Sequence, residues 1–167
     1  MSMRAPRKPV VYVETSVISF FHEVRSDPPM MVRRDWTRTW WAQASETFDL
    51  FSSVAVLNEL LKGEFPAKDE CLALFHTLPL LRTEPAIAEI VDAYIAQKVM
   101  PSDPAGDALH LAFASFHCCD FLVTWNCRHL ANANKFGHIR RINTKIGLFI
   151  PTLVTPLEMI GRDANDL

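Results

Sequence analysis

Polar residues in the segment from Asp103 to Asn126 occupy two kinds of position at which α/β proteins commonly bind ligands. Asp107 opens an apolar stretch that we expect to form a helix over 105–117, and Asn126 follows a short hydrophobic run at 121–124. The amino ends of helices and the carboxyl ends of strands border the same crevice in an open parallel sheet. A hydrolytic metal site that includes Asp107 and Asn126 is therefore the first hypothesis.

Two glutamates occur at comparable positions elsewhere in the chain. Glu14 directly follows an apolar run, and Glu59 interrupts the apolar face of a predicted helix soon after a second strand. Carboxylates that converge without cationic partners are costly unless a cation binds them, and hard oxygen ligands favour Mg²⁺ or Mn²⁺. Such an ion activates bound water and stabilises charge on a phosphoryl oxygen. We therefore expect phosphodiester hydrolysis at a site formed by Glu14, Glu59, Asp107 and Asn126, with Asp103 as the second choice of ligand.

Short apolar runs alternate with amphipathic stretches along the whole chain. Strands are predicted at 10–13, 49–53, 78–82, 121–124 and 153–154. Helices are predicted at 17–23, 31–48, 54–62, 67–76, 85–95, 105–117, 128–134, 138–147 and 156–160. Thr15 or Ser16 is the expected cap of the first helix. This alternation predicts a three-layer α/β/α fold around a central, mainly parallel sheet of four or five strands.

Length and charge limit the possible architectures and partners. A chain of 167 residues without an internal linker favours one domain over 1–167, with flexible ends at 1–8 and 161–167. The net charge of −2 means that contact with a nucleic acid requires a local basic patch. The basic residues form three groups, which are Arg4, Arg7 and Lys8; Arg33, Arg34 and Arg38; and Arg128, Lys135, Arg140, Arg141 and Lys145.

The cysteines and the apolar runs indicate a cellular location. Cys71, Cys118, Cys119 and Cys127 have the spacing of neither a disulfide framework nor a zinc ribbon, so reduced thiols in the cytoplasm are the simplest account. No apolar run approaches the roughly 18–20 residues of a membrane span. We also find no signal-peptide pattern. We expect a soluble cytoplasmic protein without a membrane partner.

Four motifs, in this order, resemble those of PIN-domain proteins of the VapC-like ribonuclease toxin group. They cover roughly residues 9 to 155 and are Tyr12-Val-Glu-Thr-Ser-Val17, Leu57-Asn-Glu-Leu-Leu61, Asp107-Ala-Leu-His-Leu-Ala112 and Leu122-Val-Thr-Trp-Asn126-Cys-Arg-His129-Leu. The resemblance implies a PIN-like fold and an endoribonuclease that uses Mg²⁺ or Mn²⁺. It also implies a homodimer that is neutralised by a small antitoxin protein encoded nearby.

The resemblance also assigns residues to the site. The family's four acidic positions fall on Glu14, Glu59, Asp107 and Asn126. The family usually has aspartate where this chain has Glu14 and Asn126, and the neutral Asn126 should weaken metal binding. The expected contacts to the RNA substrate are Ser16, Arg128 and His129, with the basic group at 135–145.

Several of these residues also have a purely structural interpretation. Glu14 and Asp107 are favourable at helix amino ends, and Asn126 suits a turn, but their joint placement favours a site. His110 is interpreted as a core or supporting histidine rather than a catalytic base. Three tryptophans are interpreted as core or dimer contacts rather than as base-stacking residues, namely Trp36, Trp40 and Trp41.

Two alternative functions remain open at the level of sequence. One is a catalytically weak or inactive PIN-like module that binds RNA or a protein, which the departures at Glu14 and Asn126 favour. The other is a metal-dependent phosphohydrolase that acts on DNA or nucleotides.

Overall fold

A computed structural model describes residues 7–100, 103 and 105–161. Its centre is a sheet of four strands, β1 (Val10–Val13), β2 (Asp49–Phe51), β3 (Phe121–Val123) and β4 (Thr152–Val154). The strands lie in the order β2-β1-β3-β4, and every neighbouring pair is parallel. The fold is thus α/β with an all-parallel central sheet of four strands, which confirms the predicted fold class.

The two central strands show why the sheet could be predicted from the sequence. Tyr12 on β1 pairs with Phe51 on one side and with Leu122 on the other. Every residue of β3, and every residue of β1 except Val10, is buried. A strand covered on both faces has no polar positions to alternate with apolar ones, so it leaves a continuous hydrophobic run.

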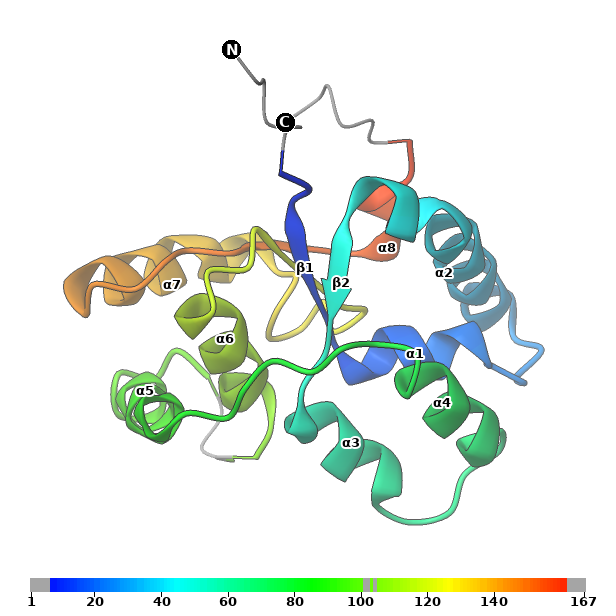
Figure 1. The fold of residues 1–167 in the computed structure, drawn as a ribbon, viewed down its shortest axis with the longest axis horizontal. Helices are drawn as coiled ribbons and strands as arrows, with labels where there is room; N and C mark the ends of the chain where they lie inside the picture. The colour runs from blue at the N-terminus through cyan, green and yellow to red at the C-terminus, as the bar shows by residue number, and fades with distance from the viewer. Residues whose placement is uncertain (1–6, 101–102, 104, 162–167) are drawn as a thin grey trace.

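Helices cover both faces of the sheet. Figure 1 shows α5, α6 and α7 on one side of the strands, and α1, α2 and α8 on the other. The arrows of β1 and β2 point toward the region in which α1 and α3 begin. The helices of the described residues are α1 (Thr15–Phe21), α2 (Pro28–Thr47), α3 (Val54–Leu61), α4 (Lys68–Phe75), α5 (Pro85–Ala96), α6 (Asp107–Phe116), α7 (Ala133–Lys145) and α8 (Pro156–Met159).

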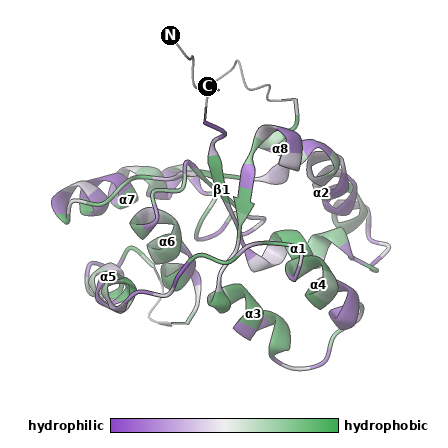
Figure 2. Ribbon diagram, viewed as in Figure 1, coloured by the Kyte–Doolittle hydropathy of each residue, from purple (hydrophilic) through white to green (hydrophobic). Residues whose placement is uncertain are grey.

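One hydrophobic core fills the space between the sheet and these helices. Its largest fully buried side chains include Tyr12, Trp40, Phe75, Tyr94 and Phe113. Figure 2 shows β1 as hydrophobic, whereas α2 mixes hydrophilic and hydrophobic residues, as a helix with one solvent-exposed face should. The core interpretation therefore holds for Trp40, which has no exposed surface.

The strand predicted at 78–82 is wrong. The only sheet pairing here is an isolated parallel bridge between Ser52 and Leu80, supported by a hydrogen bond from the backbone N–H of Leu81 to the carbonyl of Ser52 at 2.9 Å. Pro79 has no N–H to donate to a ladder. The segment therefore only touches the edge of the sheet beyond β2.

Two helix boundaries near the amino terminus differ from those predicted. Helix α1 begins at Thr15, and its cap is Glu14 rather than Thr15 or Ser16, because the Glu14 carboxylate accepts the N–H of Ser16. Helix α2 begins at Pro28, three residues earlier than predicted, because proline is favourable in the first turn, where its missing N–H is not needed.

The predicted helices at 128–134 and 138–147 are replaced by a turn and one longer helix. The carbonyl of Asn126 accepts hydrogen bonds from the N–H groups of Leu130 and Ala131, which closes the turn. Helix α7 then begins at Ala133, because the side chain of Asn132 caps it by accepting the N–H of Asn134.

The ends of the chain were predicted to be flexible at 1–8 and 161–167. Residues 1–6 and 162–167 lie outside the described residues. Lys8 donates a hydrogen bond to the carbonyl of Ser45 at 2.9 Å, so this end of the described chain contacts α2. No helix in the described part of the chain is both long enough and apolar enough to cross a membrane.

Candidate metal centre

Glu14 is held at the carboxyl end of β1 by its backbone and its side chain. Its N–H donates to the carbonyl of Val123 at 3.1 Å, which continues the pairing of β1 with β3. Oε2 accepts three hydrogen bonds, from the N–H of Ser16 at 3.1 Å, the hydroxyl of Ser16, and the hydroxyl of Thr124 at 2.7 Å. These hydrogen bonds fix the side chain of Glu14, which is buried and only 5% exposed.

The second carboxylate oxygen of Glu14 has a different environment. No described residue donates a hydrogen bond to Oε1, which lies 3.9 Å from Nε2 of His110. A buried oxygen that keeps its charge without a hydrogen-bond donor needs a nearby cation. The ring of His110 lies between Glu14 and Glu59, where its protonated form can supply that charge.

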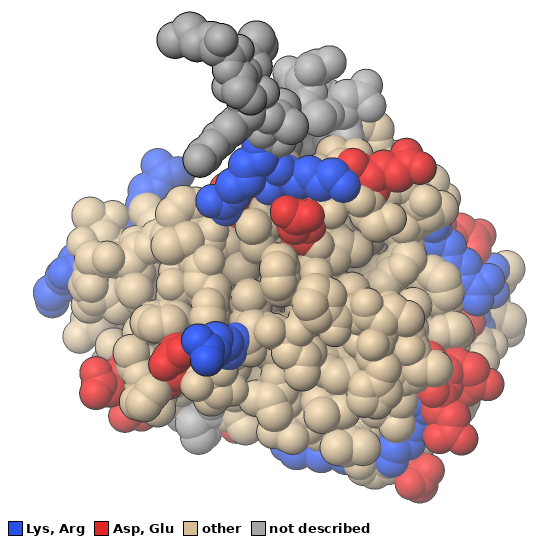
Figure 3. Space-filling model, in the orientation of Figure 1, with Lys and Arg blue, Asp and Glu red and all other residues tan. Residues whose placement is uncertain are grey.

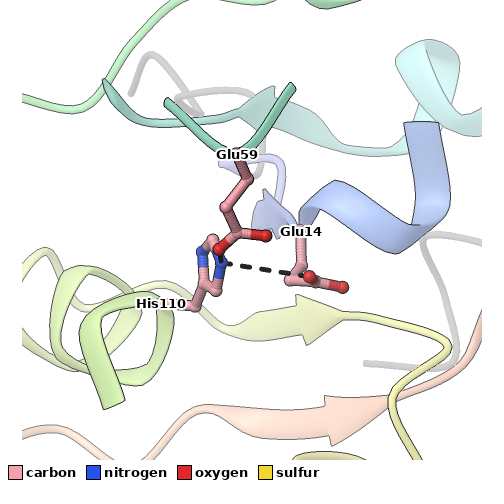
Figure 4. A group of neighbouring side chains, drawn as sticks. All are labelled: Glu14, Glu59 and His110. Atoms are coloured by element: carbon pink, nitrogen blue, oxygen red, sulfur yellow. Dashed lines mark hydrogen bonds and ion pairs between the residues drawn. The ribbon is translucent and has the colours of Figure 1, made fainter. Parts of the chain in front are cut away.

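His110 connects Glu14 with Glu59. It lies on α6 and is 1% exposed, and its Nε2 is 2.5 Å from Oε1 of Glu59 on α3. Figure 4 shows the three side chains converging from the end of β1, from α3 and from α6. Residues far apart in the sequence thus meet at the carboxyl edge of the sheet.

The ionisation of His110 and Glu59 is coupled. Burial lowers the pKa of His110, but the hydrogen bond to Glu59 and the charges of Glu14, Glu59 and Asp107 raise it, and its net pKa lies above the ordinary 6.5. Burial raises the pKa of Glu59, whereas the hydrogen bond and charge of His110 lower it, and its net pKa lies below the ordinary 4.5. Without a metal, the arrangement therefore favours an imidazolium between two carboxylates.

A buried hydrogen-bond chain fixes the orientation of the His110 ring. The hydroxyl of Tyr12 lies 2.7 Å from Nδ1 of His110 and 2.7 Å from the hydroxyl oxygen of Ser53. Burial and the charges of Glu14 and Glu59 hold the pKa of Tyr12 well above 10.0 despite its hydrogen bond to Ser53, so the phenol keeps its proton. Protonated His110 donates to Tyr12, which in turn donates to Ser53.

Ser53 links this chain back to the helix that carries Glu59. Its side-chain oxygen accepts the N–H of Ala55 at 3.2 Å and so caps α3. The same hydroxyl therefore sets the start of α3 and anchors the phenol that orients His110. Strand β1 and helices α3 and α6 are tied together at one buried point.

The three side chains also have the spacing of a metal site. One ligand atom from each of Glu14, Glu59 and His110 lies within 4.8 Å of the others. Residues this close together could share one small cation at metal–ligand bonds of about 2.0–2.2 Å. The 2.5 Å between Nε2 of His110 and Oε1 of Glu59 is a hydrogen-bond distance, so metal binding requires that this hydrogen bond opens. The imidazole nitrogen favours Mn²⁺ or another transition metal over Mg²⁺, which prefers oxygen ligands alone.

The other two predicted ligands form a separate pair beside this group. Nδ2 of Asn126 donates to Oδ1 of Asp107 at 2.9 Å. Oδ1 of Asn126 accepts the N–H groups of Arg128 at 3.2 Å and of His129 at 3.0 Å. Both the oxygen and the nitrogen of the Asn126 side-chain amide are thus engaged within the protein, and the amide holds the carboxylate of Asp107 in place.

Hydrogen bonds connect the pair to Glu14 through Thr124. The N–H of Asn126 donates to the hydroxyl of Thr124 at 2.9 Å, and that hydroxyl donates to Glu14. Asp107 also contributes to the raised pKa of His110, three residues further along α6. The four predicted residues therefore lie at one edge of the sheet, with His110 between them.

The remaining acidic candidates have structural contacts elsewhere. The carboxylate of Asp103 accepts the N–H of Ala105 at 3.0 Å and closes the turn before α6. Among the described residues, Asp103 does not belong to the group of closely spaced ligand atoms. Asp120 accepts the N–H of Val10 at 2.7 Å, so it lies at the amino ends of the strands, on the opposite edge of the sheet.

The residues predicted to contact RNA differ in how accessible their side chains are to a ligand. The hydroxyl of Ser16 is occupied by Glu14 and by the N–H of Trp125 at 2.8 Å, so it shapes the site wall. The side chain of Arg128 is exposed, and His129 is half-buried, with Nδ1 at 3.5 Å from Nζ of Lys135. Arg128 and His129 adjoin the Asp107–Asn126 pair through their backbone N–H groups.

His110 is buried, as expected for a core or supporting histidine. Its ring also lies between two site glutamates, which was not predicted. A signal was present, because His110 follows Asp107 by three residues and so shares its helix face. The sequence could not show which residues of α3 and β1 that face would meet.

The chain was also compared with known proteins. No protein-family model and no curated protein matches it.

Proposed function

We propose that this protein is a Mg²⁺- or Mn²⁺-dependent endoribonuclease of the PIN-domain type, similar to the VapC-like toxins. The observation that carries the proposal is the convergence of Glu14, Glu59 and His110 within 4.8 Å at the carboxyl edge of a parallel sheet. The Asp107–Asn126 pair beside it supplies a further oriented carboxylate. The four sequence motifs named above, which contain these residues, also support the proposal.

Each residue has a defined part in this proposal. Glu14 and Glu59 would hold the cation, and Nε2 of His110 would be the nitrogen ligand once it has lost its proton. Asp107, oriented by Asn126 at the same edge, would hold the attacking water. When bound, the ion supplies activation of that water and neutralises charge that develops on the phosphoryl oxygen.

The proposed substrate is RNA, held through its backbone. The candidates for phosphate contact are Arg128 and the basic residues of α7 at 135–145. Figure 3 shows charged residues of both signs mostly around the margin of one face of the molecule, whose centre is largely uncharged. Local arginines and lysines, rather than the overall field, must then position the strand. A cytoplasmic toxin that forms a homodimer and binds a small antitoxin completes the proposal.

One observation favours a second candidate, a PIN-like module that binds RNA or a protein without cleaving it. The Asn126 amide is occupied by Asp107 and two backbone N–H groups, so any ion must compete for its oxygen. The positive charge between the two glutamates can also be that of protonated His110 rather than that of a metal ion. Such a site would be stable and inert.

A cleavage assay distinguishes these candidates. Purified wild type, Glu59→Gln and Asp107→Asn are incubated with single-stranded RNA, DNA of the same sequence and mononucleotides, in Mn²⁺, Mg²⁺ or EDTA. Glu89→Gln, on the exposed face of α5, is the matched control. We expect RNA cleavage only with metal, reduced about 100-fold or more in both site variants and unchanged in the control.

Three results would contradict the proposal in different ways. Equal cleavage in EDTA or in Glu59→Gln would exclude the metal centre. Metal-dependent cleavage of DNA or nucleotides but not RNA would identify a different phosphohydrolase. RNA binding without cleavage at any metal concentration would identify the non-catalytic module.

A further inference from the structure

Arg33 of α2 is held by aromatic rings next to the candidate metal centre. Its guanidinium carbon lies 5.6 Å from the centroid of the Trp125 ring and 5.7 Å from that of Phe20. The two rings meet edge to face, with centroids 6.1 Å apart. The residue is half-buried, so the cation is oriented by its neighbours while part of it stays accessible.

No acidic group in the described part of the chain forms an ion pair with this arginine. Among the described residues, no carboxylate lies within 4.0 Å of its guanidinium and no acceptor takes a hydrogen bond from it. Its two neighbours on α2 are engaged, because Arg34 pairs with Asp35 at 2.9 Å and Arg38 donates to the carbonyl of Phe21 at 2.8 Å. Arg33 alone of the three keeps its donors for another partner.

Trp125 connects Arg33 to the site. It lies in sequence between Thr124, which donates to Glu14, and Asn126, which donates to Asp107. Its backbone N–H donates to Ser16, and its indole N–H donates to the hydroxyl of Thr37 on α2 at 2.7 Å. Trp125, whose ring contacts Arg33, is therefore hydrogen-bonded both to Ser16 of the candidate site and to α2.

Trp36 completes the support on the side of α2. Its ring stacks on that of Trp125 with centroids 6.2 Å apart and an interplanar angle of 21°. Three residues of α2 thus contact the indole of Trp125: Arg33 and Trp36 lie against its ring, and Thr37 accepts its N–H. A side chain that is held in this way loses less rotational freedom when it binds a ligand.

We propose that Arg33 is a phosphate-binding residue that positions the RNA backbone beside the candidate metal centre. The proposal rests on the proposed function, and adds a substrate contact from a helix outside the four motifs. A guanidinium presents a planar fork of donors that matches two phosphate oxygens, and it is weakly hydrated, so little water must be displaced. Stacking on Trp125 leaves the edge of that fork free for the phosphodiester.

The test measures RNA binding without metal, so that it does not depend on cleavage. Fluorescence anisotropy of a fluorescein-labelled oligouridylate in EDTA gives the affinity of the full chain across a range of salt concentrations. The variants are Arg33→Met and Arg33→Gln, and the matched control is Arg34→Gln, which removes the same charge one residue away. Thermal melting of each protein records whether it folds.

We expect both Arg33 variants to bind RNA about tenfold more weakly, with a salt dependence lower by about 0.7 in the slope of log K against log salt, as for one lost phosphate contact. Arg34→Gln should bind nearly as wild type does. Arg33→Gln keeps a planar group on the Trp125 ring, so it preserves the test if Arg33→Met does not fold.

Unchanged affinity and slope in a folded Arg33 variant would overturn the proposal and leave Arg33 as packing for the aromatic rings. An equal loss in Arg34→Gln would also overturn it, because the effect would then be one of general charge. If wild type binds RNA through Arg33 but never cleaves it, only the proposed nuclease function fails. If wild type cleaves RNA while the Arg33 variants bind normally, only the present inference fails.

Discussion

Nε2 of His110 lies 2.5 Å from Oε1 of Glu59, although 51 residues separate them in the chain. The imidazole is 1% exposed, whereas the side chain of Glu59 is 29% exposed. The imidazole of His110 is thus buried, whereas the carboxylate side chain of Glu59 is partly exposed to solvent. The pair can hold either a proton or a metal ion at the same nitrogen, and several measurable properties follow from that choice.

The first prediction concerns the pH dependence of stability in the metal-free protein. The raised pKa of His110 contributes stability below the ordinary 6.5, and the contribution disappears as the pH rises through the folded-state value. The lowered pKa of Glu59 contributes stability above the ordinary 4.5, and that contribution disappears as the pH falls through its folded-state value. Both contributions are therefore present between these two ordinary values.

His110→Gln isolates this effect. We expect it to lower the free energy of unfolding by about 2–4 kcal/mol at about pH 5.5, because two glutamates lose their buried cation. The difference between wild type and variant, measured by urea unfolding, should shrink as the pH rises above the neutral range. A difference that stays constant with pH would show that His110 contributes by packing alone.

The second prediction concerns the phenol that orients His110. Tyr12→Phe leaves the ring in place but removes the hydroxyl that joins Nδ1 of His110 to Ser53. We expect a loss of about 1–3 kcal/mol in the free energy of unfolding, because two buried polar groups lose a partner. Tyr94→Phe removes another buried hydroxyl, bonded to Asn143 away from the site, and is the control for metal affinity. Tyr12→Phe should weaken Mn²⁺ binding and Tyr94→Phe should not.

The third prediction follows from competition between a proton and a metal at Nε2 of His110. At about pH 6, binding of Mn²⁺ should release about one proton, because the ligand must be neutral imidazole. The lowered pKa of Glu59 means that this carboxylate is already ionised and cannot supply the proton. Calorimetry in buffers of different ionisation enthalpy measures the release. Tight binding without proton release would mean that His110 is not a ligand.

The fourth prediction concerns the neutral position in the site. Asn126→Asp removes the hydrogen bond to Asp107 and places two carboxylates together, so the metal-free protein should lose about 1–2 kcal/mol of stability. Bound Mn²⁺ should then raise the melting temperature of the variant more than that of wild type, through tighter binding. Asn134→Asp, exposed on α7, adds the same charge away from the site. An equal metal-induced shift in both variants would contradict this assignment.

The predicted helices and strands were accurate where the residues of the element itself determine its structure. The strands at Val10–Val13 and Phe121–Val123 were predicted well because burial on both faces makes their sequences continuously apolar. The strand at 78–82 was wrong because its pairing depends on β2, a neighbour of only three residues, and because Pro79 cannot donate. The turn after Asn126 was missed because a side chain and a carbonyl of the same residue close it.

The sequence by itself determined an α/β architecture with a mainly parallel sheet, and the edge of the sheet at which Glu14, Glu59 and Asp107 lie. Parallel strands must point the same way, so residues that follow them reach one edge whatever the details of packing. Only the tertiary structure decided that His110 lies between the glutamates and that Asn126 bonds Asp107. Those contacts depend on the rotation and spacing of helices brought together from distant parts of the chain, which no local pattern of residues encodes.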